Sequence, residues 1–156
     1  MEERACWVLL AYRLPREPST PRIALWRKLR QLGALQLLDG LVALPASPQA
    51  REQFEWLAES IVEAGGGAAL WLAEPAAKGQ ADELEAEVQE ARAAEYRAVA
   101  VAAERARSEG QTGHGRTLGR LRRELRRIRA RDYFGAPGRR DAEAAVESLA
   151  ATRVAL

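Results

Sequence analysis

The chain of 156 residues has few of the side chains that form covalent or metal-linked frameworks. Its single cysteine, Cys6, excludes disulfides within the chain and zinc clusters made of several thiolates. Such sparse use of cysteine fits a reducing compartment, and we therefore expect a cytoplasmic protein. We expect Cys6 to be a small buried thiol. The only histidine, His114, stands in a glycine-rich segment, where we expect a loop residue without a metal-binding role.

Long apolar runs and catalytic motifs are also missing. The first apolar run ends near Leu10, which is too short for a membrane span, and it lacks the cleavage pattern of a signal peptide. The sequence has no glycine-rich phosphate loop, no Ser/His/Asp arrangement and no cluster with metal-ligand spacing. We therefore expect no membrane partner, no cofactor and no enzymatic activity.

The first half of the sequence contains regularly alternating signals for strands and helices. Thr20-Pro21 and Ser47-Pro48 each combine a capping residue with proline at the first helical position, so each predicts the start of a helix. Asp39-Gly40 joins two apolar runs and predicts a hairpin with a type I′ turn. Gly33 is expected to end the first helix. The predicted strands are 6–12, 34–38, 41–45 and 68–73, and apolar residues on both faces of the first predict a central strand.

This order, βαββαβ, predicts a ferredoxin-like α+β sandwich over residues 1–77. In its first helix the apolar residues Ile23, Trp26 and Leu29 recur at helical spacing. All four tryptophans fall in this half, and we expect them to mark its core. The predicted buried residues of the second helix are Phe54, Leu57, Ala58 and Ile61.

Residues 78–156 form a helical, arginine-rich extension, which we expect to pack on the core as one unit. Alanine and charged residues predict a long helix over 80–109, followed by a flexible turn over 110–115. A second helix over 116–132 has Leu118, Leu121, Leu125 and Ile128 in steps of three and four, which is typical of a seam between packed helices. A short closing helix begins near Asp141 and is expected to bury Ala142, Ala145, Val146 and Leu149.

Basic charge is concentrated in residues 110–140, which hold ten arginines and two carboxylates and so carry a net charge of +8. Five of these arginines lie opposite the leucine seam on a helical projection: Arg116, Arg120, Arg123, Arg127 and Arg131. Such a stripe could follow nucleic-acid phosphates or hold an oxyanion through forked hydrogen bonds. Alternatively it is a solvated face that is partly neutralised by carboxylates of the preceding helix, namely Glu83, Glu85, Glu87 and Glu90.

A second basic group in the predicted loop and first helix comprises Arg13, Arg16, Arg22, Arg27, Lys28 and Arg30. Arg22 is predicted to lie in the first turn of a helix, where free backbone amides favour anions. We consider four of them, Arg13, Arg16, Arg22 and Arg27, a second candidate site for nucleic acid or an oxyanion. Arg13 and Arg16 could line a cleft between the core and the helices of the extension. Alternatively the group forms a basic surface that pairs with Glu17, Glu52 or Glu55.

Five segments of the chain carry a likeness to a known family: 14–29, 38–45, 55–59, 125–128 and 132–136, which include Leu38-Asp39-Gly40-Leu41 and Asp132-Tyr133-Phe134-Gly135-Ala136. They resemble the amino-terminal family of ChrB-type chromate-resistance regulators. A weaker resemblance, limited to the βαββαβ core, links the chain to phenylacetate-catabolism repressors. The family resemblance implies transcriptional regulation of chromate efflux genes. The implied partners are promoter DNA of the chromate-resistance operon and chromate as effector. Independently of the resemblance, we expect a homodimer.

Two other functions remain open at this point. The leucine seam and a sheet edge could make the chain an interaction or dimerisation module without its own DNA specificity. Less favoured is a chromate-handling oxidoreductase that works through Cys6.

Overall fold

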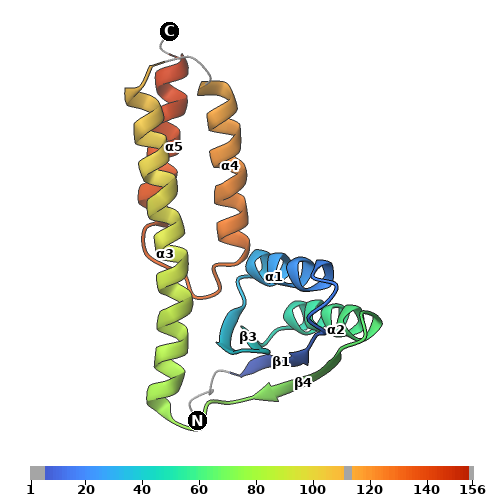
Figure 1. Ribbon diagram of the computed structural model, residues 1–156. Coiled ribbons are helices and arrows are strands. Elements are labelled where there is room, and N and C mark those ends of the chain that lie inside the picture. Colours follow the sequence, from blue (N-terminus) through green and yellow to red (C-terminus); the bar gives the residue numbers. More distant parts are fainter. Residues whose placement is uncertain (1–5, 111–113, 155–156) are drawn as a thin grey trace. The chain divides into compact units, whose positions relative to one another are not determined.

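The computed structural model describes residues 6–110 and 114–154 (Figure 1). The chain divides into two compact units, with the boundary between Leu84 and Glu85. Residues 111–113, in the predicted glycine-rich turn, lie outside the described residues. Among the described helices, none is long and apolar enough to cross a membrane.

The first unit has the predicted βαββαβ order, which confirms the α+β fold. Its four strands form one antiparallel sheet in the order β2-β3-β1-β4, the topology of a split βαβ sandwich. Figure 1 shows α1 and α2 on the same face of this sheet. The elements are β1 (Trp7–Arg13), α1 (Thr20–Leu32), β2 (Leu35–Leu38), β3 (Leu41–Pro45), α2 (Pro48–Glu63) and β4 (Gly67–Ala73).

The core of this unit lies between the sheet and the two helices. β1 is a central strand, as predicted, because it pairs with β3 on one side and β4 on the other. From α2, Phe54, Leu57 and Ile61 are buried as predicted, while Ala58 is half-buried against the same core. The strands contribute mainly Val8, Leu10, Val42 and Leu44.

Of the two predicted helix caps, that of α2 agrees with the structure, and that of α1 differs from it by one residue. At α2, the Ser47 hydroxyl accepts a hydrogen bond of 3.0 Å from the backbone N–H of Ala50, as expected of a cap. At α1, Ser19 occupies the cap position and Thr20 is already helical, so the prediction of Thr20 as the cap is wrong. Ser19 makes no capping hydrogen bond with its side chain. Gly33 ends α1 in the left-handed conformation, as predicted.

The hairpin between β2 and β3 is present, but its turn is not type I′. That turn requires positive φ at both central residues, and only Gly40 has it, with φ of 77°. An irregularity in the pairing between Gln36 and Leu38 accompanies the different turn. Gly40 also lies against β1, because its carbonyl accepts a hydrogen bond of 2.8 Å from the Tyr12 N–H.

The tryptophans do not mark the core as expected. Only Trp7 is buried, whereas Trp26, Trp56 and Trp71 are each more than half exposed. In α1 the inward face is formed by Leu25 and Leu29, which are four residues apart. Trp26 lies one residue, and hence about 100°, further round the helix from Leu25, so it faces outward.

The second unit is built from three helices around its own core. They are α3 (Lys78–Ser108), which crosses the boundary between the units, α4 (His114–Ala130) and α5 (Arg139–Val154). The predicted seam of α4 is buried in this core together with Tyr96 and Val99 of α3. From α5, Ala142, Val146 and Leu149 are buried as predicted, and Ala145 is half-buried. With 16 residues, α5 is nearly as long as the 17-residue α4 and is not the short helix we expected.

Candidate functional site

Burial of the leucine seam determines which side of α4 faces solvent. Leu121 is 2% exposed and Ile128 is fully buried, so the opposite side of the helix points outward. Four of the predicted arginines are exposed there, and we call them the α4 arginine face: Arg116, Arg120, Arg123 and Arg127. Arg127 lies 3.6 Å from Glu124, whereas the other three form no ion pair with any described residue.

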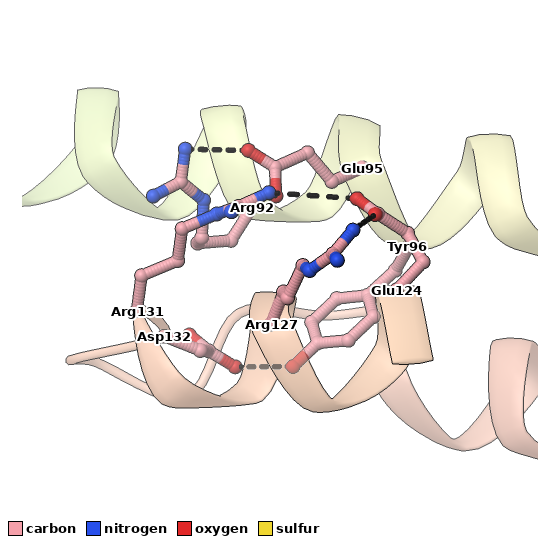
Figure 2. A network of polar contacts seen from close by, with 7 residues as sticks. All are labelled: Arg92, Glu95, Tyr96, Glu124, Arg127, Arg131 and Asp132. Carbon is pink, nitrogen blue, oxygen red and sulfur yellow. Dashed lines mark hydrogen bonds and ion pairs between the residues drawn. The ribbon is translucent and has the colours of Figure 1, made fainter. Parts of the chain in front are cut away.

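Arg131, the fifth predicted arginine of this stripe, has a different environment. Its side chain is only 14% exposed. Its Nε donates a hydrogen bond of 3.0 Å to Oε2 of Glu95, and its Nη2 lies 3.6 Å from Glu124 (Figure 2). Because its guanidinium is already bound to carboxylates, we do not include Arg131 in the α4 arginine face.

Glu95 holds a second buried guanidinium, that of Arg92. The Nη2 of Arg92 lies 2.6 Å from Oε1 of Glu95, so the two oxygens of one carboxylate bind two arginines (Figure 2). Neither arginine pairs with the carboxylates that the sequence suggested. Of those, Glu90 forms an ion pair with Arg97 of the same helix, and Glu83, Glu85 and Glu87 have no ion pair with any described residue. Sequence spacing alone did not indicate that the Glu95 carboxylate would bind both Arg92 and Arg131.

The Asp132–Ala136 segment, which carried part of the family resemblance, stabilises the loop after α4. Oδ1 of Asp132 accepts a hydrogen bond of 2.8 Å from the backbone N–H of Ala136. Oδ2 accepts one of 2.9 Å from the hydroxyl of Tyr96. Burial and this hydrogen bond raise the pKa of Tyr96 to about 12. The segment therefore has a structural role in the second unit.

The second predicted arginine group lies in the first unit, in one groove of about 890 Å³. Arg13, Arg16, Arg22 and Arg27 all line it, together with Arg30 of the same predicted basic group. We call it the α1 groove. Its other lining residues come from α1, the end of β1 and the β2–β3 hairpin, and they include the apolar side chains Leu25, Leu29 and Val42.

Charge in the α1 groove is strongly unbalanced. Among the described residues that line it, the only carboxylate is that of Asp39, against five arginines. None of the five forms an ion pair with a described residue, and Glu55, a predicted partner, instead binds Arg51 at 3.1 Å. The groove is therefore a basic site with a single lining carboxylate, and that carboxylate forms no ion pair with the five arginines.

Two aromatic side chains also line this groove. Trp26 is 56% exposed, and the guanidinium of Arg30 lies 4.8 Å from the centre of its ring. Burial raises the pKa of Tyr12; the positive charge of Arg22 lowers it in part, and Asp39 raises it further. Tyr12 is therefore neutral at physiological pH and can both donate and accept a hydrogen bond.

His114 is not the loop residue that the sequence suggested. It is the first residue of α4, is 5% exposed, and its Nε2 lies 2.6 Å from the carbonyl oxygen of Ala106. A ring nitrogen this close to a carbonyl must donate, so Nε2 carries the hydrogen. Within the described ranges, no group of three or more His, Cys, Asp or Glu is arranged to hold a metal. Cys6 is partly buried.

Comparison with known proteins gives two matches. The family model described as "Protein ChrB, N-terminal" matches residues 22–154. Among curated proteins, Protein ChrB of Cupriavidus metallidurans is 36% identical over 66 residues, covering 42% of this chain. The aligned region is only 20% of that protein's length. No solved structure matches the chain.

Proposed function

The chain belongs to the ChrB amino-terminal family, and from this premise we propose that it is a DNA-binding regulatory module for chromate-resistance genes. Family membership supports a role in chromate resistance. The proposed ligand is promoter DNA of the resistance operon, and the proposed effector is chromate, which would weaken DNA binding. The α4 arginine face is the observation that carries the DNA-binding part of the proposal.

The geometry of this face suits a phosphate backbone. From Arg116 to Arg127 the helix rises about 17 Å, a length over which duplex DNA carries about ten phosphate charges. The four arginines are exposed, and only Arg127 lies near a carboxylate. Guanidinium groups bind phosphate oxygens through paired hydrogen bonds, and each phosphate contact releases condensed counterions.

The packing of α4 against its neighbours also favours binding to a phosphate backbone. Its opposite side is anchored by four buried residues, and its last turn is followed by Arg131, whose guanidinium pairs with Glu95 and Glu124. Arginines on a fixed helix lose less conformational freedom on binding than arginines on a loop. The α4 arginine face is therefore a preorganised surface for phosphate contacts.

The test is fluorescence anisotropy with labelled duplexes from the region upstream of the gene and with random sequence, at two salt concentrations. We expect tighter binding to the upstream duplex and weaker binding in the presence of chromate. The double variant Arg116→Gln/Arg120→Gln should lower the slope of log K against log salt by about two.

The matched control is Arg105→Gln/Arg107→Gln, which removes the same charge from exposed positions at the end of α3. Its salt slope should stay within about half a unit of the wild-type value. Equal affinity for upstream and random DNA would contradict the regulatory proposal. Equal losses in both double variants would show that net charge, rather than the α4 arginine face, governs binding.

A further inference from the structure

The α1 groove has features that the phosphate contacts of α4 do not explain. Five arginines share one groove with a single carboxylate, and none of the five has an ion-pair partner among the described residues. Like charges held together repel one another, and a bound anion removes that repulsion. The first requirement for a ligand of this groove is therefore negative charge.

The volume of the α1 groove and its apolar lining indicate what the ligand contains besides negative charge. A volume of about 890 Å³ lies in the range of small-molecule sites and far exceeds that of a tetrahedral ion. Ile23 and Trp26, which are 48% and 56% exposed, contribute apolar surface that an inorganic anion cannot use. The ligand must therefore combine an anionic group with an apolar or aromatic body.

Trp26 indicates which kind of apolar or aromatic group the ligand carries. Its indole is 56% exposed in the folded chain and lines the groove, although a large aromatic side chain is usually buried. Arg30 lies over the same ring. An exposed indole beside guanidinium groups is the combination on which nucleobases stack in sites for single-stranded nucleic acid.

The phosphate would then lie near the start of α1. Arg22 is in the first helical turn, and Arg16 and Ser19 line the groove beside it. No side chain caps this helix start. Because Pro21 has no N–H and the Ile23 N–H donates to the carbonyl of Ser19, the amides of Thr20 and Arg22 are the ones left for an anion, along with the guanidinium groups. Tyr12 and Gln36 offer additional hydrogen bonds to a base or sugar.

We propose that the α1 groove binds a nucleotide unit, with its base on Trp26 and its phosphate held by Arg16 and Arg22. The unit could be a free mononucleotide or an unpaired nucleotide of a DNA strand, since both present the same chemistry. The proposal does not depend on the α4 arginine face, which lies in the other unit.

Isothermal titration calorimetry of the full chain tests this with dGMP, inorganic phosphate and deoxyguanosine as separate ligands. We expect dGMP to bind at least about tenfold more tightly than either part alone, because stacking and phosphate contacts act together. Trp26→Ala and Arg22→Gln should each weaken dGMP binding about tenfold. If phosphate binds as tightly as dGMP, the groove is an oxyanion site and the nucleotide proposal fails.

Trp56→Ala is the matched control, because Trp56 is 54% exposed on α2 and does not line the groove. It should leave dGMP binding unchanged, and equal losses in Trp26→Ala and Trp56→Ala would overturn the proposal. Circular dichroism verifies that each variant is folded.

A single-stranded oligonucleotide distinguishes the two sources of the nucleotide. If it binds more tightly than dGMP and still requires Trp26, the ligand is a DNA strand; equal affinity identifies a free nucleotide. Duplex binding by Trp26→Ala, measured in parallel, separates a failure of this proposal from a failure of the α4 proposal.

Discussion

The hydroxyl of Tyr96 donates a hydrogen bond of 2.9 Å to Oδ2 of Asp132, a residue 36 positions further along the chain. Tyr96 is fully buried in α3, and Asp132 follows the end of α4. Because Asp132 also accepts the Ala136 N–H, one carboxylate binds both a helix of the core and the loop that leads towards α5. This contact makes the loop part of the folded second unit.

The first prediction concerns the pH dependence of stability. Tyr96 has a pKa of about 12 in the folded chain, against 10.0 for an ordinary tyrosine. Its neutral form is favoured by folding, so this contribution is complete below pH 10 and is lost as the pH rises towards 12. We expect the free energy of unfolding from urea titrations to fall over this interval.

Tyr96→Phe provides the control for this pH effect. It removes the titrating hydroxyl and leaves Oδ2 of Asp132 without this donor, which should cost about 1–2 kcal/mol at pH 7. The fall in stability between pH 10 and 12 should be smaller in this variant. An identical fall in both proteins would show that another group is responsible.

The second prediction separates Arg131 from the α4 arginine face. Arg131→Gln removes a nearly buried partner of Glu95 and should destabilise the chain by about 2 kcal/mol. Arg120→Gln, at an exposed position, should change stability by less than about 0.5 kcal/mol. Thermal unfolding followed by circular dichroism measures both effects. Equal destabilisation would mean that Arg131 contributes no more than a surface arginine.

The third prediction concerns the hairpin glycine. A Cβ at Gly40 would lie 2.5 Å from the carbonyl oxygen of Tyr12, and its φ of 77° is unfavourable for other residues. Gly40→Ala should therefore lower the free energy of unfolding by about 2 kcal/mol or more.

Gly79→Ala is the matched control for the same substitution in a helix. A Cβ there meets no atom within 4 Å. Alanine is the better helix former, so this variant should be slightly more stable, by up to about 0.5 kcal/mol because Gly79 lies in the first turn of α3. Urea titrations should give opposite signs for the two glycines, and a neutral Gly40→Ala would contradict the close approach to β1.

The fourth prediction concerns the leucine seam. In the folded chain Leu121 is 2% exposed, so the seam packs against α3 and α5 and is not available to a partner. This corrects the interpretation of the seam as a dimerisation surface. Leu121→Ala should cost about 3 kcal/mol through the cavity it leaves.

Val101→Ala, at a position 55% exposed on α3, should cost far less than the seam substitution. Chemical unfolding and size-exclusion chromatography together provide the test. A change in oligomeric state with no loss of stability in Leu121→Ala would restore the dimerisation interpretation.

Local signals in the sequence were sufficient for most of the fold. The Ser47-Pro48 start, the Gly33 stop and the Asp39-Gly40 hairpin are each determined by residues within a few positions of one another, so they could be recognised without the structure. The predicted turn type was wrong, since Asp39 does not have the positive φ that a type I′ turn requires, and the strand pairing next to the turn is irregular. The expectation that the tryptophans mark the core was also wrong. Periodicity places a residue on one face of an element, but it does not show how much of that face the rest of the fold covers.

Three features could be recognised in the amino-acid sequence, because propensity, periodicity and charge are properties of short segments. They are the βαββαβ order, the three later helices and the concentration of arginines in residues 110–140. Tertiary structure alone decided the environment of each arginine. It placed Arg131 beside Glu95, left Arg120 exposed, and brought Arg13, Arg22 and Arg30 into one groove with Trp26. The physical reason is that ion pairing and solvent exposure depend on which residues distant in sequence become neighbours when the chain folds.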